Sequence, residues 1–311
     1  MIEKNKLFWK KKGRIFEPKK SGFTHGSHPT VTHFKDDIFL LAFTQRDENK
    51  RSNIFMAYIN VSEMEIDIIS EPKLVLKHGD YGHFDSDGAI SSSFIKHKEK
   101  TYLYYVGWQN LPPALWTGNT GRLVVDLENI SVKKEFIGPV FSMDKNNPIF
   151  AAATGFHIDN NEIWHTWYLS GLKWENIKND WKLRYAIFHA TSTNGIDWIS
   201  EKKQCIPFLD EKEYAFGRPS IIKEDDYFHM WYGHREINGV DKYRMGYSKS
   251  KDGLSWIRDD ENSGITVSEK GWDSEMICYP FVFSHKGIKY MLYNGNGYGL
   301  TGFGFAVQEP T

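Results

Sequence analysis

The stretch FGRPSIIKEDDYFHMWYGHREINGVDKYRMGYSKSKDGLSW, residues 216–256, decides the fold. An apolar run at residues 219–222 is followed by a polar Glu-Asp-Asp turn and by residues 227–232, in which aromatic and polar side chains alternate. Alternation with a period of two is typical of β-strands, and two such runs around a polar turn predict a hairpin. Residues 243–248 and 254–257 add two strand-like runs around a Ser-Lys-Asp-Gly turn. The stretch therefore predicts four short antiparallel strands.

The same plan occurs five times along the 311 residues. Each copy opens its first strand at a Gly or Pro, and these openings are 59, 67, 64 and 61 residues apart: Pro29, Gly88, Gly155, Pro219 and Pro280. A regular period, with insertions in the connecting loops, indicates a repeat architecture. We therefore predict an all-β fold, a five-bladed β-propeller with four-stranded antiparallel blades.

The five copies fill the chain, so we expect a single domain over residues 1–311. The expected blades cover approximately residues 17–70, 84–135, 150–200, 215–258 and 275–309, with residues 6–16 added to the last. The last copy leaves little chain for an outer strand, and residues 7–16 are strand-like. We expect this N-terminal strand to close the ring, because an open ring would expose a sheet edge at each end. An extra edge strand on the first blade is the alternative.

Composition excludes several classes of function. The formal net charge is -1 and there is no long basic run, which argues against a nucleic-acid partner. Cys205 and Cys278 are far apart and match no metal-binding or redox motif, so two reduced thiols in a cytoplasmic protein are expected. The sequence contains no apolar stretch long enough for a membrane span and no secretion signal, and we expect no metal or cofactor.

The sequence of the chain resembles that of a known superfamily. Residues 216–256, WDSEMICYPFVF at 272–283 and YMLYNGNGYGLTGFGFA at 290–306 are similar to the five-bladed propellers of glycoside hydrolase families 43, 32, 68, 117 and 130. The Tyr-Ser-x-Ser-x-Asp-Gly-x-x-Trp segment at 247–256, with a weaker copy at 189–198, is widespread in that superfamily. The similarity covers essentially the whole chain.

The resemblance implies a carbohydrate-active enzyme that acts on a glycosidic bond, glycoside hydrolase-like, with carboxylates at the mouth of the propeller channel. Its ligand would be a carbohydrate or an activated sugar, in a setting such as surface-polysaccharide metabolism. A glycosyl transferase or phosphorylase on the same fold is one alternative. A propeller that has lost catalysis and binds a glycan is another.

Candidate catalytic residues follow from where the channel opens. The first strand of each blade lines the channel, so residues at the five strand starts converge on one pocket. The family pattern calls for an Asp at the first of these starts, but this sequence has His28 there. The remaining candidates are Asp85, Asp87 and Glu275, because glycoside chemistry needs paired carboxylates. The alternatives are an Asp-rich turn that caps its own strand, and a rim carboxylate paired with Lys or Arg.

Further residues near the strand starts and the second-strand ends are candidates for substrate binding: His25, His28, Trp108, Arg218, His234, Arg235, Tyr279 and Asn296. The guanidinium of Arg218 suits a carboxylate or a phosphate, and a salt bridge to a candidate carboxylate is the alternative. A mouth histidine could replace a missing acid, although no spacing resembles a metal motif. Trp108, Trp116, Trp174 and Tyr298 are candidate platforms for sugar rings. The loop QNLPPALWTGN at residues 109–119 could form a wall over the pocket or pack on the surface.

Overall fold

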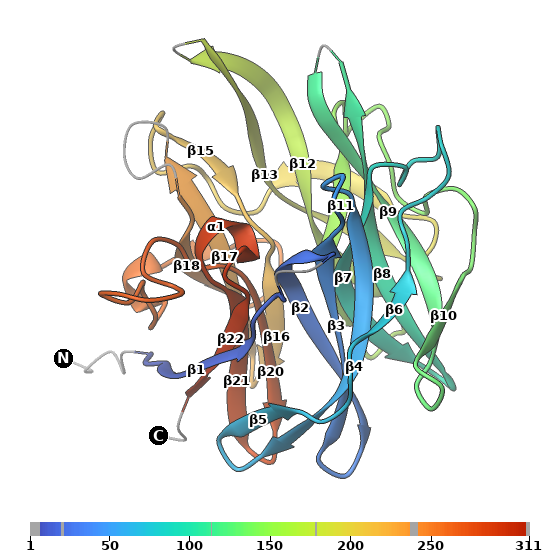
Figure 1. Cartoon of the computed structure of the whole chain (residues 1–311). Coiled ribbons are helices and arrows are strands. Elements are labelled where there is room, and N and C mark those ends of the chain that lie inside the picture. The colour runs from blue at the N-terminus through green and yellow to red at the C-terminus, as the bar shows by residue number, and fades with distance from the viewer. Residues whose placement is uncertain (1–6, 20–21, 113, 178, 237–241, 309–311) are drawn as a thin grey trace, which may run out of the picture.

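A computed structural model describes residues 7–19, 22–112, 114–177, 179–236 and 242–308 (Figure 1). Regular structure in these ranges is almost entirely β-strand, so the predicted all-β class is confirmed. Two short helical segments interrupt the strands: η1 (Asp260–Asn262) and α1 (Asn296–Gly299). None of the helices in these ranges has the length and apolar character needed to cross a membrane.

The strands form five successive groups. The first group contains β2 (Thr24–Lys35), β3 (Ile38–Arg46), β4 (Ser52–Ser62), β5 (Glu65–Ile68) and β6 (Lys73–Leu76). The second contains β7 (Gly88–His97), β8 (Lys100–Leu111), β9 (Ala114–Asp126) and β10 (Ser131–Lys134). The third contains β11 (Ala151–Ile158), β12 (Trp164–Ile177), β13 (Asp180–Ser192) and β14 (Ile199–Gln204). The fourth contains β15 (Glu213–Phe216), β16 (Ser220–Glu224), β17 (Tyr227–Glu236), β18 (Arg244–Ser250) and β19 (Ile257–Arg258). The fifth contains β20 (Cys278–His285), β21 (Ile288–Asn294), β22 (Phe303–Gln308) and, from the N-terminal end, β1 (Lys10–Phe16).

Pairing within each group is antiparallel, as the hairpin pattern of the sequence predicts. Two short strands share one partner in the first group, where β5 and β6 both pair with β4, and in the fourth, where β15 and β16 both pair with β17. Single parallel backbone pairs link the first four groups in order: Ser52 with Gly88, Asn119 with Ala151, and Tyr185 with Ala215. The groups are therefore arranged in the order of the sequence.

The N-terminal strand lies where the sequence analysis expected it. β1 pairs antiparallel with β22, which gives the fifth group the strand order β1-β22-β21-β20. The ring of Phe16 stacks on Phe303 with centroids 5.2 Å apart. The alternative, an extra edge strand on the first group, is not what the pairing shows.

Apolar side chains pack between neighbouring groups and make the core. One cluster combines Val31 and Phe43 of the first group with Leu292 and Phe303 of the fifth, so the two ends of the chain's β-structure are in contact. Burial of each such side chain contributes roughly 1.5–3 kcal/mol. Aromatic side chains thus contribute to the packing between neighbouring groups.

The Ser-Lys-Asp-Gly turn joins two groups. The carboxylate of Asp252 accepts hydrogen bonds from the backbone N–H groups of Leu254 (2.8 Å) and Ser255 (2.7 Å). Gly253 has a φ of 73°, a conformation that glycine adopts without strain. Its carbonyl accepts a 2.8 Å hydrogen bond from the indole N–H of Trp167 on β12. The motif therefore attaches the fourth group to the third.

The weaker copy of the motif does the same one group earlier. Gly195 has a φ of 69°, and its carbonyl accepts a 2.6 Å hydrogen bond from the hydroxyl of Tyr104 on β8. The third group is thereby attached to the second. The residues that carry the family resemblance most clearly therefore have a structural role.

Candidate functional site

A cavity of about 450 Å³ is lined by side chains from all five strand groups. Its polar and aromatic lining residues are His28, Arg46, Ser52, Ser91, Ser92, Trp108, Asn110, Trp116, Phe150, Thr154, Tyr185, Arg218, Arg235, Tyr243, Tyr279 and Tyr298. Within the described parts of the chain, no aspartate or glutamate lines this cavity. Three guanidinium groups therefore meet there without a carboxylate.

Arg218 is the most deeply buried of the three arginines, with only 2% of its surface exposed. It lies between β15 and β16, and its guanidinium donates to the carbonyl oxygens of Pro29 (2.9 Å) and Ser92. Among the described residues it forms no ion pair, and burial lowers its pKa to about 9. Taking a cation out of water without a counter-charge is costly. The cavity thus contains a positive charge that no carboxylate of the described residues neutralises.

Arg235 occupies a cage of tyrosines. Its guanidinium carbon lies 4.9 Å from the ring centroids of both Tyr214 and Tyr243, and Nη1 donates a 2.9 Å hydrogen bond to the hydroxyl of Tyr298. The Nε–H group is buried and has no hydrogen-bond partner in the described ranges. The aromatic faces therefore hold the side chain in place by cation–π contact.

His28 and Tyr279 face each other from the first and fifth groups. Their rings stack with centroids 3.9 Å apart, and both backbones have a positive φ, 52° and 54°. Such conformations are strained for residues with a side chain and cluster at functional sites. Burial, followed by the charges of Arg218 and Arg46, holds the pKa of His28 well below 6.5. His28 is therefore neutral near pH 7.

Five of the predicted substrate-binding residues line the cavity together: His28, Trp108, Arg218, Arg235 and Tyr279. The indole N–H of Trp108 is buried without a hydrogen-bond partner among the described residues. Residues far apart in sequence thus converge at one site, as the repeat pattern predicted.

Asp85 does not reach the cavity. Its side chain is fully buried and forms an ion pair with Lys134 on β10 at 2.6 Å, and it accepts a 3.1 Å hydrogen bond from the hydroxyl of Tyr105. A carboxylate neutralised and enclosed in this way cannot contact a ligand. The expectation that Asp85 lies at the channel mouth is therefore corrected, because its carboxylate is buried in an ion pair with Lys134.

Asp87 and Glu275 are also absent from the lining. The carboxylate of Asp87 is half-buried and accepts a 2.9 Å hydrogen bond from the backbone N–H of Asn110, so it lies beside one lining residue. The side chain of Glu275 is 58% exposed and pairs with Lys242. We expected paired carboxylates in the same pocket as Arg218. This expectation is corrected, because neither Asp87 nor Glu275 lines the cavity.

Two further predicted residues, His25 and Asn296, do not line the cavity. The Asn296 side-chain carbonyl accepts hydrogen bonds from the backbone N–H groups of Glu275 (2.8 Å) and Met276 (3.1 Å). His25 contacts the hydroxyl of Thr24 at 2.9 Å, and burial, followed by the charge of Arg46, lowers its pKa to about 4. Asn296 therefore holds the segment before β20, and His25 bonds to its neighbour at the start of β2.

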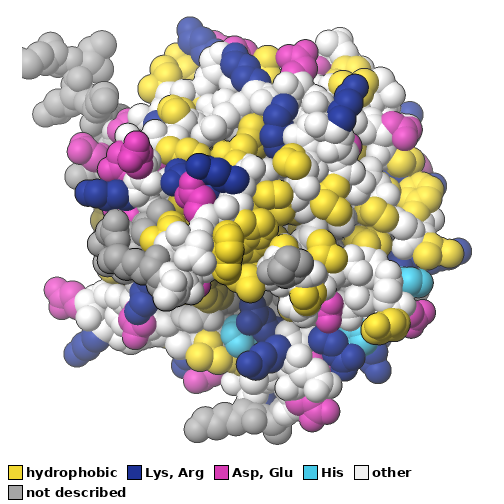
Figure 2. Space-filling model, turned by 90° about the horizontal axis from the view of Figure 1, so that it is seen from above, with side chains coloured by type: hydrophobic (Ala, Val, Ile, Leu, Met, Phe, Trp, Pro, Cys, Tyr) yellow, Lys and Arg dark blue, Asp and Glu magenta, His cyan; other side chains and the backbone are white. Residues whose placement is uncertain are grey.

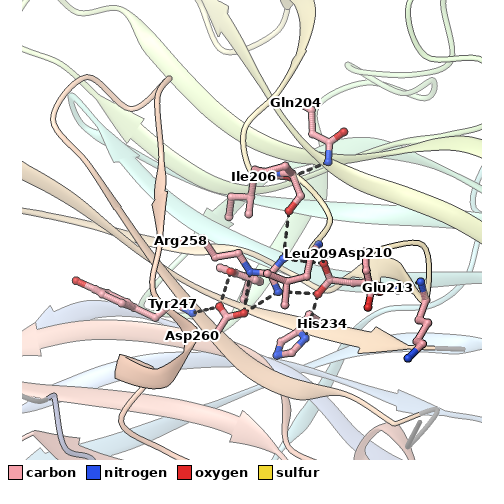
Figure 3. A network of polar contacts seen from close by, with 12 residues as sticks. Gln204, Ile206, Leu209, Asp210, Glu213, His234, Tyr247, Arg258 and Asp260 are labelled. Carbon is pink, nitrogen blue, oxygen red and sulfur yellow. Dashed lines mark hydrogen bonds and ion pairs between the residues drawn. The ribbon is translucent and has the colours of Figure 1, made fainter. Parts of the chain in front are cut away.

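His234 belongs to a separate ionic network in the fourth group, shown in Figure 3. Its Nδ1 lies 3.2 Å from the carboxylate of Glu213, which is fully buried and also accepts two 2.6 Å bonds from Arg258. Arg258 in turn contacts Asp260 at 2.6 Å. The network ties β15, β17 and the chain after β19 together, which explains why His234 is directed away from the cavity.

Arg46, Tyr185 and Tyr243 are among the lining residues that were not predicted. A signal existed for Arg46, since it ends the second strand of the first group as Trp108 and Arg235 do near the ends of theirs. The hydroxyls of Tyr185 and Tyr243 hydrogen-bond to each other, and burial raises the pKa of Tyr243 well above 10. Tyr185 lies on β13, the third strand of its group, and Tyr243 directly precedes β18. Neither is at a strand start or a second-strand end, where candidates were expected.

The donor set does not resemble a metal centre. In the part of the chain that the structure describes, no group of three or more His, Cys, Asp or Glu side chains is placed to hold a metal ion. Cys205 and Cys278 are both buried and free. The cavity offers cations, hydroxyls and aromatic faces, a combination that binds anions and the faces of sugar rings.

The fold is that of the five-bladed propeller glycoside hydrolases of family 43 and its relatives. A structure of a complex of BT0996 and RGII matches 98% of this chain and 93% of its own, with a TM-score of 0.73 and 16% identity. A thermostable family-43 glycoside hydrolase matches 94% and 90% with a TM-score of 0.63 and 16% identity. An endo-arabinase from Bacteroides thetaiotaomicron matches 96% and 98% with a TM-score of 0.61 and 12% identity. At this level of identity the likeness establishes the fold alone.

By sequence, the chain belongs to the family of a Mycobacterium tuberculosis protein, the uncharacterized protein Rv1502 of strain ATCC 25618 / H37Rv. The two are 32% identical over 308 residues, which cover 97% of this chain and 100% of the mycobacterial one. Its counterpart MT1551 in strain CDC 1551 / Oshkosh matches to the same extent. No protein-family model matches the chain.

Proposed function

We propose that the protein binds an acidic carbohydrate, one that bears a carboxylate or a phosphate, in the central cavity. The observation that carries this proposal is Arg218, a buried cation without a carboxylate partner in the described ranges. Arg46 and Arg235 add to the positive charge. A bound anion would supply the missing counter-charge and form charge-assisted hydrogen bonds.

The unused hydrogen-bond groups of the cavity support the same ligand. Trp108 and Arg235 line the cavity, and each has a buried N–H donor without a partner among the described residues, so a ligand rich in acceptor oxygens would suit this lining. Trp108 and Trp116 offer flat apolar faces for the C–H surfaces of a sugar ring. The similar fold of the BT0996 and RGII complex agrees with a carbohydrate ligand.

The proposal includes one ring of five blades formed by residues 1–311, with β1 as the outer strand of the last blade. Two observations support it: β1 pairs with β22, and the apolar cluster around Phe43 and Phe303 joins the first group to the fifth. In such a ring the cavity lies on the common axis, where each blade contributes residues to it.

Binding measurements with matched sugars test the proposal. We expect uronates and sugar phosphates to bind at least about tenfold more tightly than the corresponding neutral sugars, because a charge-assisted hydrogen bond contributes roughly 1.5–3 kcal/mol. Isothermal titration calorimetry across such a panel, repeated at raised salt, measures this preference. Equal affinity for neutral and acidic members would contradict the proposal.

A second candidate function is sugar transfer or phosphorolysis, in which the anion site holds a phosphate. The described lining residues include no pair of carboxylates that could hydrolyse a glycosidic bond. One carboxylate, that of Asp87, accepts a hydrogen bond from the lining residue Asn110 and so lies at the edge of the cavity. Phosphorolysis can proceed with one carboxylic acid as proton donor.

For this second candidate we expect Asp87→Asn to lower turnover of a sugar phosphate by roughly 100- to 10,000-fold while the affinity stays unchanged, since the amide keeps the shape but cannot supply a proton. Steady-state rates and calorimetry separate the two quantities. Glu275→Gln, at an exposed ion pair, is the control and should retain activity. Undiminished turnover in Asp87→Asn would remove Asp87 from the mechanism.

A further inference from the structure

Two long hairpins rise beside each other at the mouth of the cavity. β8 and β9 form one, β12 and β13 form the other, and both tips lie at the top of Figure 1. Trp116 of the first hairpin and Trp174 of the second meet with ring centroids 6.4 Å apart. Trp116 and its neighbour Leu115 also line the cavity. The tips are thus continuous with the proposed ligand site.

The tip of the first hairpin has an unusual composition. Hairpin turns normally carry Gly, Asn or Asp, whereas residues 111–115 read Leu-Pro-Pro-Ala-Leu. Leu111 is 48% exposed and Leu115 is 51% exposed. Two exposed leucines beside a turn lower solubility and have no role in the core, so they indicate a binding function.

The second hairpin adds an aromatic group at the same level. Trp181 on β13, near the tip, is 49% exposed and pairs across the hairpin with Asn176. In the view down onto this face, hydrophobic side chains gather over its middle, with Lys and Arg side chains at several places around them (Figure 2). Exposed Leu and Trp side chains on protruding tips are typical of proteins that insert into the interfacial layer of a membrane.

We propose that this face docks on a lipid surface, with Leu111, Leu115 and Trp181 in the interfacial layer and an anionic sugar head group in the cavity. The inference rests on the proposed function, because the head group is the anion that Arg218 would bind. An amphiphile with an anionic sugar head and an apolar tail matches both parts of the site. Its head would enter the cationic cavity, and its tail would remain beside the apolar tips. The positive cavity also complements the negative surface of a membrane that contains anionic lipids.

Vesicle flotation with the whole protein tests the proposal. The probes are vesicles of phosphatidylcholine alone and of phosphatidylcholine mixed with phosphatidylglycerol. We expect the protein to float with the mixed vesicles, and the double variant Leu111→Asn, Trp181→Gln to bind them at least about tenfold more weakly, since each side chain loses its apolar burial. Neither residue lines the cavity, so the variant should keep the acidic-sugar affinity.

The matched control replaces two exposed apolar residues that lie outside the two hairpins. Ile199 on β14 and Ile257 on β19 are 73% and 63% exposed, and Ile199→Asn, Ile257→Gln should float like the unmodified protein. A protein that stays out of both vesicle fractions, or a hairpin variant that floats as well as the control, would overturn the lipid proposal. Either result leaves the acidic-sugar preference to be judged separately by calorimetry, so the two proposals fail independently.

Discussion

Replacing Arg218 with methionine is expected to lower the affinity for an acidic sugar by about 100-fold or more. Removing one partner of a buried charged pair costs roughly 2–5 kcal/mol, and every 1.4 kcal/mol is a factor of ten. The affinity for the matching neutral sugar should change far less. Calorimetry with both sugars, on the variant and the unmodified protein, measures the difference.

The stability of the same variant should change little, which distinguishes a ligand-binding arginine from a structural one. Methionine removes two hydrogen bonds, to Pro29 and Ser92, but it also removes a buried cation whose pKa burial lowers to about 9. These two effects oppose each other in the ligand-free protein. Ligand addition should then raise the melting temperature of the unmodified protein and fail to raise that of the variant.

Arg122 provides the matched control. It is equally buried, with 3% exposed, but it forms a 2.5 Å ion pair with Glu135 and donates to the carbonyl of Gly195 away from the cavity. Arg122→Met should cost about 3 kcal/mol or more of unfolding free energy and leave the sugar affinity unchanged. If Arg218→Met instead lost stability and kept its affinity, Arg218 would be a structural residue and the acidic-sugar proposal would fail.

The fold was predictable because the turns repeat. Residues that start and end strands, such as Pro219 and Gly253, recur at regular intervals, and a local backbone requirement places them in each copy. The position of β1 followed from counting strands in the last copy. Such features depend on short-range chemistry, which the sequence displays directly.

The cavity was only partly predictable because convergence depends on side-chain direction. Strand starts and second-strand ends identified Arg218, Trp108 and Arg235, because the backbone positions of these residues bring them to the cavity. Asp85 occupies an equivalent start, yet its carboxylate is buried in an ion pair with Lys134, 49 residues later. No local sequence pattern predicts the ion pair of Asp85 with Lys134, because it depends on how β10 packs against the loop before β7. The sequence therefore predicted the cationic half of the site better than the acidic candidates.

Glu213 is a fully buried carboxylate with a large expected effect on stability. Burial alone would raise its pKa, but hydrogen bonds from Arg258 and His234, the charge of Arg258 and the backbone N–H of Leu209 outweigh burial and lower it to about 2. The ordinary value is 4.5, and each pKa unit corresponds to about 1.4 kcal/mol. The ionised group therefore contributes roughly 3 kcal/mol to the free energy of unfolding.

The pH dependence of this contribution has a definite sign. A carboxyl whose pKa is lowered by folding stabilises the protein fully above pH 4.5 and loses that effect as the pH falls toward 2. Glu213→Gln should therefore be less stable than the unmodified protein by about 3 kcal/mol at pH 7, because the neutral amide leaves Arg258 with a weaker partner. The difference should shrink below pH 4.5 as Glu213 itself becomes protonated.

Urea unfolding of both proteins from pH 7 to pH 3 measures this difference. Glu275→Gln, at an exposed ion pair with Lys242, should change the unfolding free energy by at most about 1 kcal/mol at any pH. Curves for Glu213→Gln and the unmodified protein that stay parallel down to pH 3 would show that the carboxylate is not the titrating group.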